Sequence, residues 1–222
     1  IMVLGKEIRL NRILKKGKML CIPLDHGISS GPLRGIQNIS ELINQTQDSG
    51  LTCFLVNKGI IKSLPAPPRI GLIAHMSAAT SLGPDPNNKI SKGSVKEAIR
   101  LGADAVSLHI NIGSKEEPSM LYKLGQVSDQ CNEWNIPLIA MMYPRGDNIT
   151  NPHDPTIVAH TARIGAEAGA DIVKTVYTGD VDSFREVIKS CPVPIVIAGG
   201  PKANTDHEIC LLYTSPSPRD IS

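Results

Sequence analysis

The chain has few aromatic side chains, almost no net charge and no long apolar run. Aromatic residues make up 3% of its 222 residues, and the formal net charge is +2 at pH 7. Stacking platforms and a strongly basic surface are therefore scarce, and no nucleic acid is expected as a partner. No apolar run approaches the roughly 20 residues that span a bilayer, so no membrane partner is expected either.

Neither disulfide pairs nor a secretory leader are expected from the sequence. Segment 1–18 lacks a cleavable apolar stretch that ends in small residues. The five cysteines are odd in number, far apart and never arranged as CxxC: Cys21, Cys53, Cys131, Cys191 and Cys210. This usage favours reduced thiols and a cytoplasmic location over disulfides or a structural zinc site.

What the sequence does contain is an alternation of short apolar segments with longer amphipathic ones. Strands are predicted at 19–24, 52–57, 70–75, 104–109, 137–143, 171–175 and 194–200. Helices are predicted near 40–49, 93–101, 115–133, 154–168 and 180–190. Continuous runs of Val, Ile and Leu are typical of a parallel sheet covered on both faces.

A local pattern repeats before these strands. Segments 98–106 (AIRLGADAV) and 166–173 (AEAGADIV) each combine a helix end, a capping glycine and the start of a strand. Repeated units of this kind indicate βαβ connections. Seven strands in a chain of this length predict an α/β fold, the (β/α)8 TIM barrel.

The composition changes near residue 211. The segment LLYTSPSPRDIS is rich in Ser and Pro and has no strand–helix periodicity. We expect a single barrel domain over residues 1–210, truncated before its eighth strand, and an atypical, non-native tail over 211–222. A disordered native tail is the alternative, and the genomic coding sequence decides between the two.

Polar residues gather where the predicted strands end, which is where TIM barrels carry their active sites. The candidates, in chain order, are Asp25, His26, His75, His109, Tyr143, Arg145, Lys174, Gly199, Gly200 and Lys202. Polar residues scattered through a core would not collect at one mouth in this way.

Lys174 stands inside an otherwise apolar strand, DIVKT. Alternation places it on the same face as Ile172 and opposite Val173 and Thr175. If that face lines the barrel, desolvation favours the neutral amine, the form that attacks a carbonyl to make a Schiff base. A structural lysine paired with a carboxylate is the alternative.

Asp25 and Tyr143 are the expected catalytic companions of Lys174. A carboxylate at the end of the first strand can steady a cationic iminium or relay protons, and a phenol in the same mouth can act as general acid or base. Taken singly, Asp25 is equally compatible with a loop cap and Tyr143 with a half-buried rim aromatic.

Anion binding is expected after the seventh strand, in AGGPKANTD. Gly199 and Gly200 let backbone N–H groups approach a phosphate, Lys202 adds charge, and barrel phosphate sites commonly form at this place. A plain turn is the alternative. His26 and Arg145 are further substrate-binding candidates; Arg145 would bind a phosphate or carboxylate, or pair with an acidic loop residue.

A metal-dependent mechanism is the rival interpretation. His26, His75 and His109, with Asp25 or Asp104, are potential metal ligands. No HxH, HxxH or HExxH spacing occurs among them, so the ligands of one metal ion would have to come from three different strands. We therefore expect no metal and no cofactor.

The chain resembles the archaeal-type class I aldolase family over roughly residues 8–210. The motifs that carry the resemblance are PLDHG, MMYPRG, ADIVKTVYTGD and AGGPKANTD, in this order. The resemblance implies a Schiff-base lysine at Lys174, an acidic residue at Asp25, a proton-transferring Tyr143, a phosphate loop at Gly199 and Gly200, and no metal. Family members continue into an eighth strand that ends in a Gly-Arg pair, from which this sequence departs.

The resemblance also implies a substrate class. Segments 102–114 and 171–192 are more similar to transaldolase-type synthases of the family than to its fructose-bisphosphate aldolases. Such a synthase joins a three-carbon unit from 6-deoxy-5-ketofructose 1-phosphate to L-aspartate semialdehyde, in aromatic amino acid biosynthesis. Phosphorylated ketose and aldehyde substrates and a homo-oligomer are expected on this basis. A fructose-bisphosphate aldolase and an inactive sugar-phosphate-binding remnant are the alternatives.

Overall fold

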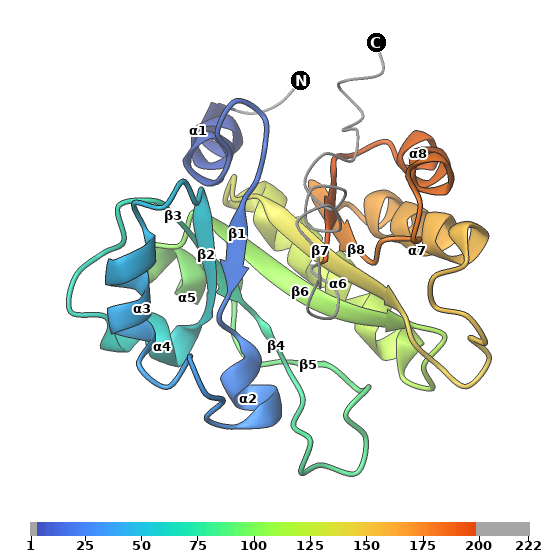
Figure 1. Ribbon diagram of the computed structural model, residues 1–222, viewed down its shortest axis with the longest axis horizontal. Helices are drawn as coiled ribbons and strands as arrows, with labels where there is room; N and C mark the ends of the chain where they lie inside the picture. The colour runs from blue at the N-terminus through green and yellow to red at the C-terminus, as the bar shows by residue number, and fades with distance from the viewer. Residues whose placement is uncertain (1–3, 199–222) are drawn as a thin grey trace.

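The computed structural model describes residues 4–198, so Gly199, Gly200, Lys202 and the segment 211–222 lie outside the described residues. Seven parallel strands form one curled sheet, in the order β1-β2-β3-β6-β7-β8-β9 (Figure 1). They are β1 (Cys21–Pro23), β2 (Cys53–Asn57), β3 (Gly71–His75), β6 (Ala105–Ile112), β7 (Leu138–Pro144), β8 (Ile172–Thr175) and β9 (Ile195–Ile197). All seven predicted strands are confirmed, and their parallel order is that of a TIM barrel.

The five predicted helices are also present and cover the outer face of the sheet. They are α3 (Ile39–Thr46), α5 (Val95–Arg100), α6 (Glu117–Glu133), α7 (Pro155–Glu167) and α8 (Val181–Ser190). Side-chain caps fix where several of them begin. Asp154 accepts hydrogen bonds from the first-turn backbone of α7, and Asp180 accepts one from that of α8. No helix within residues 4–198 is long and apolar enough to cross a membrane.

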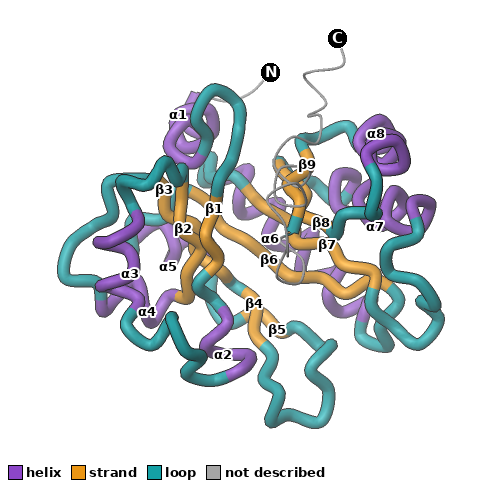
Figure 2. The backbone as a smooth tube through the Cα atoms, viewed as in Figure 1, coloured by secondary structure: helices purple, strands orange, loops and turns teal. Residues whose placement is uncertain are grey.

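Five further elements were not predicted from the sequence. They are α1 (Leu4–Ile13), α2 (His26–Ser30), α4 (Lys58–Ser63) and the two short strands β4 (Ser77–Ala78) and β5 (Ile90–Ser91). The last two pair antiparallel and form a ribbon that leaves the end of β3. Figure 2 shows α1 at one end of the sheet, and α2 and the β4–β5 ribbon at the opposite end.

The two faces of the sheet build two separate apolar clusters. The larger one lies between the strands and the outer helices and includes Val173. The smaller one lines the inner face and includes Ile139, Met141, Tyr143 and Ile172. Because side chains alternate along a strand, Lys174 points to the same inner face as Ile172. The side chain of Lys174 therefore lies on the inner face of the sheet.

Helix α1 closes the end of the sheet at which the strands begin. Ile13, at the end of this helix, has no exposed surface and belongs to the inner cluster. The first residue of β3 is Gly71, where an added Cβ would lie 2.6 Å from the carbonyl oxygen of Arg12. Glycine is needed there because the helix backbone approaches the strand so closely.

The aspartates of the two GAD segments hold α1 in place. Asp104 accepts a hydrogen bond from the backbone near the start of β3 (2.9 Å) and pairs with Arg12 of α1 (3.2 Å). Asp171 accepts one from the start of β7 (2.8 Å) and pairs with Lys6 of α1 (2.8 Å). The repeated sequence pattern thus marks the closed end of the barrel, and the open end is left for the candidate site.

Candidate active site

Polar side chains collect on the inner face where the parallel strands end. They come from β2, β3, β6, β7 and β8 and from the residue that follows β1, and the three on β6 share one face because inward-pointing residues recur at every second position. The set is Asp25 after β1, Asn57 in β2, His75 in β3, Ser107, His109 and Asn111 in β6, Tyr143 in β7 and Lys174 in β8. The predicted trio of Asp25, Tyr143 and Lys174 is thus placed at one mouth.

Lys174 lies partly buried between two inner-face neighbours. It is in register with Met141 of β7 and Val196 of β9, both in contact with the inner cluster. Its positive charge acts on the titration of Tyr143 and of His75, which places its ammonium within the polar set. An amine in this position can be reached by a carbonyl that enters from the mouth.

Tyr143 is almost fully buried, with 6% of its surface exposed. Burial raises the pKa of its phenol, while the positive charges of Lys174 and Arg145 oppose that rise. The ring meets His109 edge-on at 4.8 Å between centroids, and the Arg145 guanidinium lies 4.9 Å from the Tyr143 ring centroid. The phenol therefore stays protonated near neutral pH and can give a proton to a reacting group.

A cavity of about 270 Å³ adjoins Tyr143. Its walls come from the segment after β7 and from the end of β8, and they include Arg145, His153 and Val176. His153 is exposed, and its Nδ1 hydrogen-bonds the carbonyl of Tyr177 at 2.8 Å. Neither Lys174 nor Asp25 lines this cavity, so it flanks the polar set at Tyr143 and Arg145 and does not enclose it.

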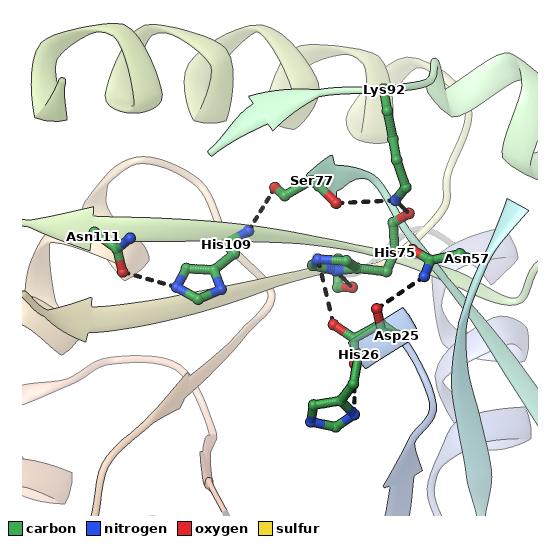
Figure 3. A network of polar contacts seen from close by, with 9 residues as sticks. Asp25, His26, Asn57, His75, Ser77, Lys92, His109 and Asn111 are labelled. Carbon is green, nitrogen blue, oxygen red and sulfur yellow. Dashed lines mark hydrogen bonds and ion pairs between the residues drawn. The ribbon is translucent and has the colours of Figure 1, made fainter. Parts of the chain in front are cut away.

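Asp25 is contacted by side chains from β2, β3 and α2 (Figure 3). Its backbone carbonyl accepts a hydrogen bond from the Asn57 amide at 2.9 Å. One carboxylate oxygen lies 3.5 Å from Nε2 of His75, and the other lies 3.9 Å from Nδ1 of His26. The Nδ1 atom of His75 is 2.8 Å from the hydroxyl of the fully buried Ser107.

His109 belongs to a second polar chain on the same face. Its Nε2 lies 2.8 Å from the side-chain oxygen of Asn111, whose amide donates to the carbonyl of Asn87 in the β4–β5 loop (2.8 Å). Burial lowers the pKa of His109 to about 3, and the nearby positive charges of Lys89, Arg145 and Lys174 act in the same direction. The ring is therefore a neutral, site-lining group.

The β4–β5 ribbon contributes two lysines that the sequence analysis missed. The amine of Lys92 donates to the carbonyl of Ser77 at 3.0 Å and to that of His75. Burial lowers the pKa of Lys92 to about 8, and the nearby Asp25 opposes this shift. Burial and the positive charge of Arg145 also lower the pKa of Lys89. The ribbon thus adds positive charge at the mouth.

The structure does not assemble the metal site considered as a rival. Asp104 lies at the closed end of the sheet, where it binds Arg12, so the metal hypothesis that used Asp104 is wrong. His26 is largely exposed on α2. Within residues 4–198, no group of three or more His, Cys, Asp or Glu side chains is arranged to hold a metal ion.

Comparison with known proteins identifies the family. A DeoC/LacD family aldolase domain matches residues 19–209. The chain belongs to this family. As a DeoC/LacD family member with Schiff-base-forming relatives, it is a class I aldolase.

Several relatives of this aldolase are named as heptulosonate or heptanoate synthases. The 2-amino-3,7-dideoxy-D-threo-hept-6-ulosonate synthase 1 of Archaeoglobus fulgidus is 46% identical over 209 residues, which is 93% of this chain and 76% of that protein. The Halobacterium salinarum synthase is 40% identical, over 90% of this chain and 75% of the relative. A 2-amino-4,5-dihydroxy-6-oxo-7-(phosphonooxy)heptanoate synthase of Streptomyces griseus is 38% identical, over 97% and 80%.

Solved structures agree with this family. A Schiff-base-forming fructose-1,6-bisphosphate aldolase has a TM-score of 0.86 at 30% identity, over 95% of this chain and 89% of its own. An archaeal fructose 1,6-bisphosphate aldolase has a TM-score of 0.84 at 31% identity, over 92% and 83%. The predicted class I aldolase family, barrel fold and enzyme class are all confirmed.

Proposed function

We propose that this aldolase is a transaldolase-type synthase whose Schiff base forms on Lys174. The observation that carries the proposal is the inward placement of Lys174 at the mouth of the sheet, beside the buried phenol of Tyr143 and near Asp25. A lysine, a proton donor and a carboxylate at one mouth are what carbonyl capture and carbon–carbon bond cleavage require.

The roles of the three residues follow from their chemistry. After its ammonium loses a proton, the amine of Lys174 attacks a ketone of the donor, water leaves, and the cationic iminium becomes an electron sink. The adjacent carbon–carbon bond then breaks, the other part of the donor leaves as an aldehyde, and a three-carbon enamine stays on the lysine. The enamine adds to the acceptor aldehyde, and hydrolysis of the resulting iminium releases the product and the free amine. Tyr143 transfers protons at the bond that breaks and forms, while the Asp25 carboxylate steadies the iminium or relays protons from substrate hydroxyls.

The proposed substrates come from the relatives that are synthases. Three of these relatives are named as heptulosonate or heptanoate synthases, at 38–46% identity. The proposed donor is 6-deoxy-5-ketofructose 1-phosphate and the proposed acceptor is L-aspartate semialdehyde, with a product that enters aromatic amino acid biosynthesis. Arg145 and His26, which border the mouth, are proposed to contact the substrate.

The phosphate loop, the domain organisation, the oligomeric state and the cellular location are also proposed. Gly199, Gly200 and Lys202 are proposed to bind the donor phosphate, and a barrel domain over residues 1–210 with an atypical segment 211–222 remains the predicted organisation. A homo-oligomer and a cytoplasmic location stay predictions. Light scattering of the purified protein tests the oligomer directly.

A condensation assay with the wild type and a lysine variant tests the proposed function. We expect the purified protein to condense the ketose phosphate donor with L-aspartate semialdehyde, with the product detected by mass spectrometry. The Lys174→Met variant keeps the length of the side chain but lacks the amine, and it should yield no product. Product formation by this variant would contradict the proposal.

Fructose 1,6-bisphosphate is the second candidate substrate, because aldolases of this sugar share the fold at TM-scores of 0.84 and 0.86. Cleavage of that sugar, without condensation onto the semialdehyde, would favour this second function. Turnover of neither substrate would favour a sugar-phosphate-binding protein without catalysis.

A further inference from the structure

A buried imidazole connects the candidate catalytic carboxylate to the interior of the sheet. His75 is 6% exposed and lies between two oxygens, the Ser107 hydroxyl on Nδ1 (2.8 Å) and a carboxylate oxygen of Asp25 on Nε2 (3.5 Å). Ser107 has no exposed surface at all. Ser107 lies on β6, the strand next to β3 on one side, whereas Asp25 follows β1, two strands away on the other side. Figure 3 shows the His75 ring pointing toward the Asp25 carboxylate.

The surroundings of His75 oppose a positive charge on the ring. Burial lowers the pKa of His75 well below its usual value, and four positively charged or titratable neighbours act in the same direction: Lys92 on the ribbon, His109 on β6, Lys174 on β8 and Lys89 on the ribbon loop. Asp25 is the acidic group that faces the ring. The imidazole is therefore neutral and carries one N–H.

The position of that one proton follows from the two partners. An ionised carboxylate can only accept a hydrogen bond, whereas a serine hydroxyl can donate or accept. Both ring nitrogens have a suitable hydrogen-bond partner when the N–H is on Nε2 and points toward Asp25, and the Ser107 hydroxyl donates to Nδ1. The 3.5 Å separation is at the outer limit of a hydrogen bond, as is common in catalytic sites without substrate.

We propose that His75 is a positioning residue that fixes the orientation of Asp25 through an Nε2–H hydrogen bond locked by Ser107. The inference rests on the proposed function, since it assigns His75 to the catalytic role of Asp25. One carboxylate oxygen of Asp25 is then occupied by His75. The other oxygen, on the side of the exposed His26, is left for the iminium or for substrate hydroxyls.

Two substitutions at position 75 separate this role from simple packing. In His75→Gln the amide nitrogen reaches about as far as Nε2, so a donor to Asp25 is kept. In His75→Asn the shorter side chain places its amide near Nδ1, so the bond to Ser107 is kept and the donor to Asp25 is lost. Both variants remove the ring and disturb the packing to a similar extent.

We expect His75→Gln to keep most of the wild-type kcat. His75→Asn should lose on the order of 10- to 100-fold in kcat with KM little changed, which is the usual effect of losing an outer partner that orients a catalytic group. Thermal unfolding of both variants measures the packing effect. An equal loss of kcat in the two variants would overturn the proposal.

The imidazole can also be observed directly in the intact wild-type protein. Nitrogen NMR, with the His75 ring signals assigned by through-bond correlation to the His75 backbone in the wild-type protein, should show the neutral Nε2–H tautomer throughout about pH 5 to 8. An imidazolium, or the Nδ1–H tautomer, in that range would contradict the inference even if neither variant folds. Borohydride trapping of substrate by the wild type separates the two proposals. If no substrate is trapped, the proposed function is wrong. If substrate is trapped but the two variants lose kcat equally, only the proposed role of His75 is wrong.

Discussion

Tyr143 shows burial and charge acting against each other at one side chain. Removal from water raises the pKa of its phenol, and the nearby Lys174 and Arg145 partly offset that rise. The net result is a protonated hydroxyl next to an amine. This pair is suited to hand a proton to a leaving oxygen or carbon while the lysine holds the iminium.

Removal of the Tyr143 hydroxyl should stop proton transfer without preventing carbonyl capture. In Tyr143→Phe the ring still packs on His109, so we expect kcat to fall about 10²- to 10⁴-fold while borohydride still traps the iminium. Steady-state kinetics and trapping measure the two effects. Tyr122→Phe, at an exposed tyrosine on α6, is the matched control and should leave kcat unchanged. Loss of trapping in Tyr143→Phe would refute this role.

His109 makes the stability of the fold depend on pH. Its pKa is lowered by burial to about 3, against an ordinary value of 6.5, so between these values the unfolded chain binds a proton that the folded chain does not. Stability from the neutral ring is complete above pH 6.5 and is lost as the pH falls. Between pH 7 and 5 this costs roughly 1–2 kcal/mol, allowing for partial solvent access.

Urea unfolding of the wild type and of His109→Gln checks this dependence. The variant lacks the titrating ring, so its stability should fall less between pH 7 and pH 5 than that of the wild type. The other histidines are shared by both proteins and cancel in the comparison. Equal losses in the two proteins would show that His109 is not held neutral.

The site residues that the sequence revealed differ from those it did not reveal in how strongly they contrast with their neighbours. Asp25, Tyr143 and Lys174 were found because an ionisable group at the end of an apolar strand contrasts with its neighbours. Asn57 and Ser107 were missed because small polar side chains fit within a strand without breaking its pattern. Their role becomes visible only when parallel pairing brings β1, β2, β3 and β6 side by side.

Elements were predictable where periodicity is strong and unpredictable where tertiary packing decides. The seven strands and five main helices follow from continuous apolar runs and capped amphipathic segments. Helix α1 carries many charges and a weak apolar stripe, and its place depends on ion pairs to the distant Asp104 and Asp171. The strands β4 and β5 have two residues each, too few for any pattern.

Two isoleucines on α1 test its function as the cap of the closed end. Ile13 is fully buried in the inner cluster, whereas Ile8 on the same helix is 57% exposed. We expect Ile13→Ala to lower the free energy of unfolding by about 2–5 kcal/mol and Ile8→Ala to change it by less than about 0.5 kcal/mol. Denaturant titrations measure both. Similar effects at the two positions would mean that α1 does not seal the sheet.

The two ends of the curled sheet have different functions in the molecule. At the end where the strands begin, aspartates and apolar residues bind α1 and stabilise the fold. At the end where they finish, histidines, amides, a phenol and a lysine face an opening bordered by the β4–β5 ribbon. The fold could be predicted from the sequence, whereas the position of this ribbon and its lysines could not, because it depends on contacts with Ser29 and Asn111.

Activity should survive removal of divalent metals. The electron sink in this account is the iminium on Lys174, which needs no Lewis acid. Dialysis against a chelator should therefore leave the condensation rate unchanged, with a zinc-dependent aldolase as positive control. Loss of activity that added Zn²⁺ or Mn²⁺ restores would show that a metal takes part.

Lys92 is the amine that competes with Lys174 as the Schiff-base residue. Burial lowers its pKa to about 8, but its amine donates hydrogen bonds to backbone carbonyls at the end of β3 and the start of β4. Lys174 instead points into the inner face beside Tyr143. A Lys92→Met variant should therefore still form the covalent adduct.

Borohydride reduction in the presence of the ketose phosphate donor, followed by peptide mass mapping, tests the central claim most directly. The account predicts one donor-derived adduct on the peptide that contains Lys174, present in Lys92→Met and absent in Lys174→Met. No adduct in the wild type, or an adduct on Lys92 or Lys89, would contradict it.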